Sequence, residues 1–219
     1  SAPTLTSTIT RTTGRLAATV GHRVAEGLHK TANLDISTVP SSVEAITPRW
    51  LTGALCADVP GALVEGFDRF GATSQTTSRA SLQVRYNEAG ADAGLPENVF
   101  VKSTATLRQR MFLGLIRCIE GEPLFYRDIR PSLAIDCPQG YYGAVDDRSW
   151  RSVVVIEDIA ATRGATFCHA TSKVSRPDIE SLISGMASFH GAMWESKALD
   201  AQWLKSPLDH LHNTSAFLN

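Results

Sequence analysis

The segment that decides the fold reads Val99-Phe100-Val101-Lys102-Ser103 and has the alternating pattern of a β-strand. Alternation predicts that Phe100 and Lys102 share one face of the strand, while Val99 and Val101 share the other. A lysine in the middle of a strand points either to solvent or into a cleft, and the segment alone leaves both interpretations open. In a dry cleft Lys102 needs an anionic partner, because an unpaired buried ammonium costs several kcal/mol.

Two more strands are predicted on the N-terminal side of this segment. Residues 64–70 have an extended pattern, and residues 81–86 alternate between apolar and polar side chains. The connection 87–98 contains glycine and proline, which is typical of a surface loop between strands. We therefore expect three consecutive antiparallel strands, of which 99–103 is the third.

The segment between the first two strands, 71–78, consists of small and polar residues, and we expect it to form a loop. A loop without bulky side chains allows backbone amides and hydroxyl groups to approach phosphate oxygens. A plain hairpin tip without a ligand is the alternative, and the segment taken alone favours it.

Helices and two further strands follow the third strand. Helical patterns cover 107–119 and 122–129, and apolar segments predict strands at 141–145 and 152–157. This order predicts an α+β fold: a five-stranded antiparallel sheet with a helix inserted after the third strand.

Glu122 offers Lys102 an anionic partner. It lies in the first turn of the predicted helix 122–129, where a carboxylate also suits the helix dipole. A capping or dipole role alone is the alternative, and Glu120 is a second carboxylate that could pair with the lysine.

The segment Val153-Val154-Val155-Ile156 is the core of the last predicted strand, and Glu157, Asp158 and Ile159 follow it. A strand that leaves a sheet and becomes a linker exposes backbone N–H and C=O groups, and such groups can bind the edge of a purine. A central strand with a polar end is the alternative.

A helix over 178–194 is the last clear element, and its start is marked by Pro177 and Asp178. We expect His190 to be a packing residue on its apolar face. No third ligand lies at metal-site spacing from His210 and His212, so they are interpreted as surface residues, and Asp146-Asp147 as a turn. The stripe expected to be buried consists of Ile179, Leu182, Ile183, Met186, Phe189 and Met193.

The overall composition excludes several functional classes. Lysine and arginine number 21 against 22 acidic residues, and the resulting net charge of −1 does not favour nucleic-acid binding. The apolar runs are too short for a bilayer crossing, and we expect residues 1–13, which are rich in Ser and Thr without an apolar core, not to be a secretory signal. Four scattered cysteines without a CxxC pair predict a reduced, cytoplasmic protein.

The order of these features is typical of the ATP-binding half of a kinase-like fold: a small-residue loop, a strand lysine, a helix glutamate, and an apolar strand entering a linker. The sequence resembles the aminoglycoside phosphotransferase superfamily, especially its choline-kinase-like and ecdysteroid-kinase-like members. The resemblance covers about residues 46–194, and 186–194 is similar to the helix that opens the larger lobe of the family. It is most specific at 70–74, 100–102, 122–126 and 155–159.

The resemblance implies a role for each matching residue. Lys102 would bind the α- and β-phosphates of ATP, and Glu122 would hold Lys102 in place. The backbone carbonyl of Ile156 and the amide of Ile159 would bind the adenine, with Phe100 against the ring. The other residues implied at the nucleotide are Ser74, Gln75 and Thr76 over the phosphates, and Glu157 beside the adenine.

One part of the family pattern is absent from the sequence. The family has a His-Gly-Asp catalytic loop with an asparagine five residues on and a later aspartate for Mg²⁺. Only His190 among the six histidines precedes a glycine, and Ala192 follows where the aspartate should be. We expect the chain to be the N-terminal part of a longer kinase, with no catalytic residue of its own. A nucleotide-binding module that has lost catalysis is the alternative.

These observations predict three parts and one function. A polar leader and an amphipathic helix occupy 1–44, an ATP-binding lobe 45–160, and a linker with the start of a helical lobe 161–219. The predicted function is transfer of the γ-phosphoryl group of ATP, with Mg²⁺ bound elsewhere, to a hydroxyl of a small molecule. The alternatives are a non-catalytic, regulatory nucleotide-binding module and a purely structural α+β domain.

Overall fold

A computed structural model describes Gly14 and residues 17–21, 36–74, 76–116, 118–204, 206 and 208. Most of the predicted amphipathic helix in the leader, together with Gln75, His210 and His212, lies outside these residues. The strands are β1 (Val64–Ser74), β2 (Ser78–Tyr86), β3 (Asn98–Ser103), β4 (Gly140–Asp146) and β5 (Arg151–Glu157). The helices and helical turns are η1 (Val43–Ala45), α2 (Pro48–Leu55), α3 (Glu88–Asp92), α4 (Leu107–Leu115), α5 (Gly121–Leu124), η2 (Phe125–Ile129), η3 (Arg130–Ser132), α6 (Ile159–Arg163), α7 (Arg176–Met193) and η4 (Lys197–Asp200).

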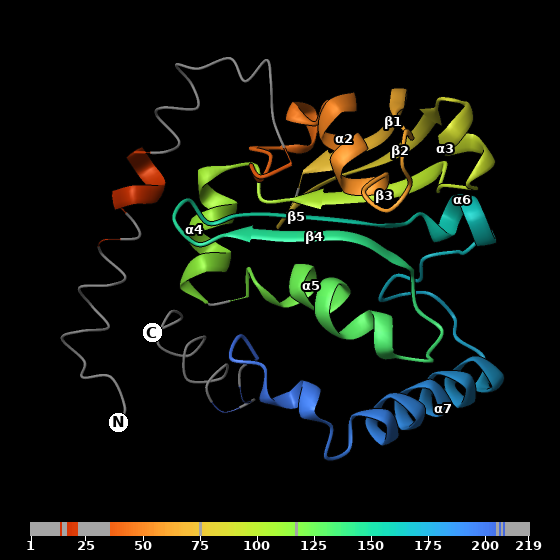
Figure 1. Cartoon of the computed structure of the whole chain (residues 1–219). Helices are drawn as coiled ribbons and strands as arrows, with labels where there is room; N and C mark the ends of the chain where they lie inside the picture. Colours follow the sequence, from red (N-terminus) through yellow and green to blue (C-terminus); the bar gives the residue numbers. More distant parts are fainter. Residues whose placement is uncertain are drawn as a thin grey trace.

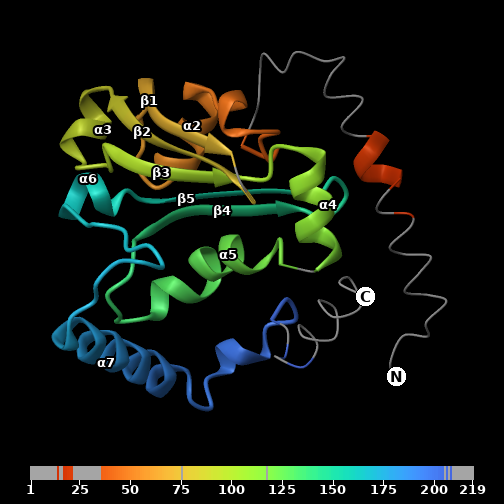
Figure 2. The same cartoon turned by 180° about the vertical axis from the view of Figure 1, so that it is seen from behind.

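The fold is α+β and is built on a five-stranded antiparallel sheet, as the sequence predicts. The strand order is β1-β2-β3-β5-β4, so β3 lies at the centre of the sheet. The chain leaves β3 through α4 and α5, adds the edge strand β4, and returns as β5 beside β3. Figure 1 and Figure 2 show α2 over one face of the sheet and α5 over the other, with α7 beyond α5.

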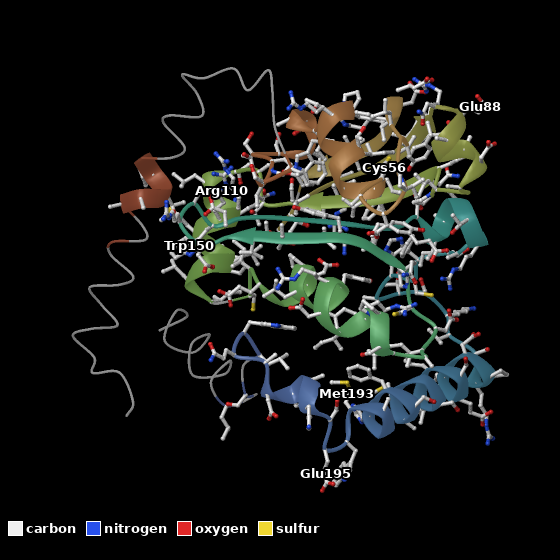
Figure 3. All side chains as sticks on the ribbon, viewed as in Figure 1. Cys56, Glu88, Arg110, Trp150, Met193 and Glu195 are labelled. Atoms are coloured by element: carbon white, nitrogen blue, oxygen red, sulfur yellow. The ribbon has the colours of Figure 1, made fainter. Side chains whose placement is uncertain are left out.

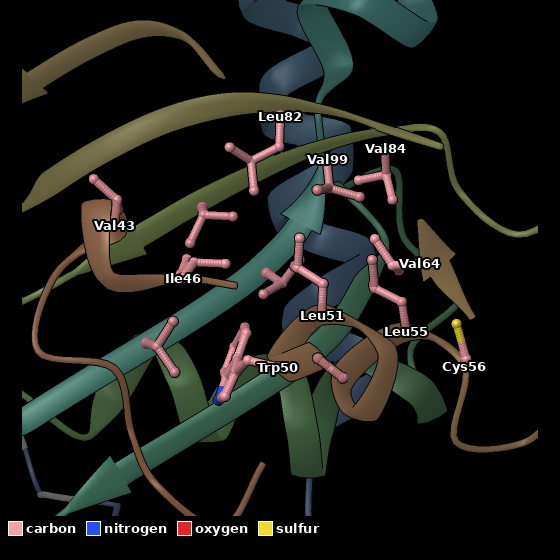
Figure 4. Close-up of a cluster of buried hydrophobic side chains, with 14 of the residues drawn as sticks. Val43, Ile46, Trp50, Leu51, Leu55, Cys56, Val64, Leu82, Val84 and Val99 are labelled. Atoms are coloured by element: carbon pink, nitrogen blue, oxygen red, sulfur yellow. The ribbon is translucent and has the colours of Figure 1, made fainter. Parts of the chain in front are cut away.

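The face of the sheet under α2 holds the main apolar core. Thr47 caps α2 by accepting a hydrogen bond from the amide of Trp50, and Pro48 starts the helix. The Trp50 side chain is fully buried, packs edge-to-face on Tyr142 at 5.2 Å, and donates its indole N–H to the carbonyl of Thr38. Figure 4 shows this core, which also contains Val43, Ile46, Leu51, Leu55, Val64, Leu82, Val84 and Val99.

The opposite face of the sheet is covered by α5 and η2 at β4 and β5. The packing there is close: a Cβ on Gly143 would lie 2.1 Å from the carbonyl oxygen of Pro123. Leu124, which follows Pro123 in α5, is also buried. The predicted helix 122–129 is present but not uniform, because it begins as α5 and continues as the wider π-helical turn η2. The close packing of α5 on β4 fixes the position of Glu122 relative to the sheet.

The predicted loop 71–78 is shorter in the structure than expected. β1 continues to Ser74 and β2 begins at Ser78, so most of this small-residue stretch belongs to the ends of a β-hairpin. The register of β1 and β2 shifts between Phe70 and Thr73. Gly71 in this stretch has a φ of +59°, which glycine adopts at low cost because it has no Cβ. Strand pairing therefore replaces the loop that composition alone suggested.

The expectation that the stripe of α7 is buried is wrong for most of its length. Ile179, Leu182, Ile183 and Met186 are between 46% and 64% exposed, and His190, expected to pack, is exposed as well. Only Met193, labelled at the end of α7 in Figure 3, is buried. It belongs to a small cluster with Ile129 and Leu133. Periodicity identified an apolar face correctly, but it does not say whether another element covers that face.

Candidate functional site

A cleft of about 410 Å³ opens on the sheet face opposite α2. Alternate residues of β2 and β3 form its floor: Arg79 and Ser81 from β2, and Phe100 and Lys102 from β3. The end of β5 and the chain beyond it form the far wall. The cleft exists because α5 covers β4 and β5, while no described helix covers this face of β2 and β3.

Lys102 and Glu122 form an ion pair at this cleft. The Nζ of Lys102 donates to the Oε1 of Glu122 at 2.5 Å. The two side chains are 27% and 40% exposed, so the pair is partly desolvated and remains open to a ligand. Lys102 is the next-to-last residue of β3, and Glu122 lies in the first turn of α5, 20 residues later. Between the two carboxylates that the sequence left open, the structure pairs Lys102 with Glu122.

Arg79 brings a second positive charge to the cleft, and sequence reasoning missed it. The register of β2 and β3 places Arg79 directly opposite Lys102, and the register of β1 and β2 places Thr73 opposite Arg79. Directly opposed residues of antiparallel strands point to the same face. An arginine on a strand is ordinarily interpreted as a solvated residue, and only the strand register reveals its neighbour.

Glu157 and Asp158 stand at the far end of the cleft, and both carboxylates are engaged within the protein. Glu157 accepts hydrogen bonds from Arg163 at 2.5 and 2.8 Å, from the hydroxyl of Thr162 at 2.7 Å, and from the amide of Gln139 at 3.1 Å. The bonds from Arg163, above all, lower the pKa of Glu157 to about 2. Asp158 is buried and caps α6.

The backbone at the end of β5 differs from residue to residue. Ile156 is paired with Phe100 of β3 on one side and Gly140 of β4 on the other, so its backbone lies inside the sheet. The amides of Glu157 and Asp158 donate to carbonyls of neighbouring segments. The amide of Ile159, the first residue of α6, has no acceptor among the described residues, which is expected at a helix start.

Two aromatic residues not singled out from the sequence also line the cleft. Tyr126 stands beside the ion pair, and burial together with the charge of Glu122 raises its pKa to about 12, so the phenol is neutral near pH 7. Phe167, from the segment after α6, is 65% exposed and faces the same hollow as Phe100. The position of Phe167 depends on the path of the linker, for which the sequence holds no signal.

The expectation that Ser74 and Thr76 lie over the phosphates in the cleft is wrong, because both residues line a different hollow. Gly71 and Thr73 line the cleft, whereas Ser74 and Thr76 line a neighbouring hollow at α4. The Ser74 hydroxyl accepts a hydrogen bond from the Gln109 side chain at 3.1 Å, which ties the end of β1 to α4. Phe100, Lys102, Ile156, Glu157 and Ile159 all line the cleft, and Gln75 lies outside the described residues.

The cleft does not supply a metal site from the residues that the structure describes. Within the described ranges, no group of three or more His, Cys, Asp or Glu side chains could hold a metal ion. The nearby carboxylates of Glu122, Glu157 and Asp158 are bound to Lys102, to Arg163 and to the amides of α6, respectively. The family resemblance implies that the ligands of Mg²⁺ lie elsewhere, in a later part of the kinase, and these carboxylates do not test that expectation.

Comparison with known proteins adds no identification. No protein-family model matches the chain, and neither a curated protein nor a solved structure matches it. Within the described part of the chain, no helix has both the length and the apolar character needed to cross a membrane. The function has to be inferred from the chemistry of the cleft.

Proposed function

We propose that this chain is the ATP-binding part of a phosphotransferase that transfers the γ-phosphoryl group of ATP to a hydroxyl of a small molecule. The cleft between the sheet, α5 and the chain after β5 is the ATP site. In this proposal the lobe has a kinase-like arrangement, and the chain from α7 onward begins a helical lobe.

The observation that carries the proposal is the ion pair between Lys102 and Glu122. A lysine on the central strand of a sheet is costly to hold in a partly desolvated cleft unless a carboxylate fixes it. Glu122 fixes the ammonium and leaves two of its three N–H donors for other acceptors. Phosphate oxygens are suitable acceptors, because they are anionic and approach a compact ammonium from several directions.

The two ends of the cleft differ in a way that suits a nucleotide. Lys102 and Arg79 lie at one end, and Phe100, Phe167 and the amide of Ile159 lie toward the other. An aromatic and aliphatic slot with a free backbone donor suits a purine ring. The residues of this chain thus bind and orient ATP, and no chemical step is assigned to them.

Binding of ATP to the isolated chain tests the proposal. We expect Mg-ATP to raise the melting temperature of the wild-type chain by mass action. Lys102→Ala is expected to abolish that shift while changing the free energy of unfolding by no more than about 1 kcal/mol, because partly exposed ion pairs contribute little to stability. Lys197→Ala is the matched control, since Lys197 is an exposed lysine in η4 and outside the cleft.

Two results would contradict the proposal. One is a wild-type chain that shows no shift at millimolar Mg-ATP; the other is a shift that Lys102→Ala leaves unchanged. The control must respond to ATP like the wild type, or the loss in Lys102→Ala says nothing about the cleft.

A non-catalytic nucleotide-binding module is the second candidate, because none of the 219 residues forms a His-Gly-Asp loop. It predicts the same ATP-dependent stabilisation. The two candidates separate on the product of the full-length gene: γ-phosphoryl transfer that is lost in Lys102→Ala supports the enzyme, whereas binding without transfer supports the module.

A further inference from the structure

The phenol of Tyr126 is a half-buried polar group on the wall of the cleft. Its ring contacts a neighbouring phenylalanine, but its hydroxyl makes no hydrogen bond with any residue that the structure describes. The hydroxyls of Tyr86 and Tyr142, by contrast, donate to backbone carbonyls at 2.8 and 3.3 Å. Because the hydroxyl of a buried tyrosine ordinarily has a partner, the Tyr126 hydroxyl is available to a ligand in the cleft.

The strand register places Tyr126 beside the part of the cleft that we assign to the base. Phe100, Ile156 and Gly140 are paired across β3, β5 and β4, so the three residues form one row on the same face of the sheet. Tyr126 packs against this row, because a Cβ on Gly140 would lie 2.9 Å from its Cδ1 atom. Lys102 is two residues further along β3, about 7 Å away. A ring that lies over Phe100 therefore has Tyr126 at one of its edges.

Two hydrogen-bond donors consequently border the base from different directions. The amide of Ile159 lies beyond the end of β5, and the Tyr126 hydroxyl lies on the β4 side. A ring between two donors is bound best when it has an acceptor toward each of them. A purine has acceptor nitrogens in both of its rings, and N7 is the free acceptor of the five-membered ring. A pyrimidine has one ring and no equivalent of N7.

We propose that Tyr126 recognises the base by donating its hydroxyl hydrogen to N7 of a purine, so that the cleft selects purine over pyrimidine nucleotides. This inference rests on the proposed function, because it assumes that a nucleotide places its base over Phe100. Burial and the charge of Glu122 raise the pKa of Tyr126 to about 12, so the phenol keeps the proton that it donates. The Ile159 amide then serves the six-membered ring, and Tyr126 serves the five-membered ring.

The test compares ADP with 7-deaza-ADP, which has a C–H group in place of N7. Isothermal titration measures both affinities for the wild type and for Tyr126→Phe, which lacks only the hydroxyl. The wild type should bind 7-deaza-ADP about 3- to 10-fold more weakly than ADP, the range expected for one neutral hydrogen bond. Tyr126→Phe should bind the two nucleotides equally. The preference of the wild type for ADP over CDP should also become smaller in this variant.

Tyr141→Phe is the matched control, because Tyr141 is a half-buried tyrosine of β4 that packs against the main core instead of lining the cleft. It should distinguish ADP from 7-deaza-ADP like the wild type. Thermal unfolding without ligand is the second measurement. Tyr126→Phe removes a hydroxyl that has no partner among the described residues, so its melting temperature should stay level or rise. Tyr142→Phe removes a hydroxyl that donates to the carbonyl of Ile36, and its melting temperature should fall.

Failure of the role of Tyr126 can be told apart from failure of the proposed function. The role of Tyr126 is overturned if the wild type binds ADP and 7-deaza-ADP equally, or if Tyr126→Phe distinguishes them as the wild type does. A lower melting temperature of Tyr126→Phe without ligand also overturns it, because the hydroxyl would then have a partner within the chain. In these cases ADP binding that depends on Lys102 leaves the proposed function intact. If the wild type binds no nucleotide, the proposed function fails, and the recognition of a base fails with it.

Discussion

The two faces of strand β3 have different surroundings and different roles. Val99 and Val101 are fully buried against α2 and the rest of the main core. Phe100 and Lys102, which alternate with them, line a cleft on the other face. One strand therefore supplies stability on one side and the groups of a candidate binding site on the other. A lysine is tolerated at the centre of the sheet because Glu122 pairs with it and the cleft leaves it partly exposed.

The helices explain why the faces differ. On the core face, α2 and η1 lie over the central strands and close the space with Trp50, Leu51 and Val43. On the cleft face, α5 and η2 lie over β4 and β5 and leave β2 and β3 open. Substitutions on the first face should therefore change the free energy of unfolding, and substitutions on the second should change ligand binding.

The largest effect is expected for Trp50→Ala. It removes a fully buried indole, its edge-to-face contact with Tyr142 and its hydrogen bond to Thr38, and replaces them with a cavity. Urea unfolding should show a loss of about 3–5 kcal/mol. Trp194→Ala is the control, because Trp194 is 78% exposed and its removal should cost far less. Equal losses in the two variants would mean that the core is not centred on α2.

A smaller loss of stability, together with weaker ATP binding, is expected for Gly143→Ala. The new methyl group would collide with the backbone of α5 at Pro123, directly after Glu122, so α5 must shift away from β4. Overpacking of this kind costs about 1–3 kcal/mol. Because Glu122 moves with α5, the ATP-dependent rise in melting temperature should also fall.

The matched control for this substitution is Gly185→Ala. A Cβ at Gly185 in α7 meets nothing within 4 Å, and alanine favours the helix, so stability should stay level or rise slightly. If Gly143→Ala were as stable as the wild type and bound ATP equally well, the close seat of α5 on β4 would be refuted.

The sequence predicted the sheet better than the site, and particular residues show why. The alternation in 99–103 is a local pattern, and the strand is found where it was expected. The sequence narrowed the partner of Lys102 to two carboxylates, Glu122 and Glu120. It did not decide between them, because tertiary packing determines which one faces the sheet. Arg79 was missed, since its neighbour is set by the register between strands, which no local pattern encodes.

Burial of α7 could not be predicted from its sequence for the same reason. An apolar stripe shows that a helix has a face suited to packing, but the covering element is a tertiary feature. The prediction for the small-residue segment 71–78 was wrong for a different reason. Its composition suggested a loop, but most of it belongs to paired strands β1 and β2. Position and exposure of Phe167 likewise depend on the route of the linker.

The smallest expected effect concerns the rim of the cleft, where Glu157 joins β5 to α6 through Arg163. The pKa of Glu157 is lowered to about 2 in the folded chain, against 4.5 for an unperturbed glutamate. A group with a lowered folded pKa adds stability above its unfolded pKa, and this contribution is lost as pH falls through the folded value. The wild type should therefore lose stability relative to Glu157→Gln between about pH 4.5 and pH 2, and not above pH 6.

Urea unfolding of both proteins across this pH range measures the difference, and it also sharpens the contrast between the faces. Arg163→Met should reduce the pH dependence as Glu157→Gln does, and the double variant should add little, because one interaction is removed in each case. Parallel pH curves for wild type and Glu157→Gln would show that the carboxylate is not held by Arg163. Trp50→Ala, by contrast, removes only neutral contacts, so its cost should be the same at pH 3 and pH 7. The apolar face is thereby expected to be insensitive to pH, and the rim of the cleft to carry the acid dependence.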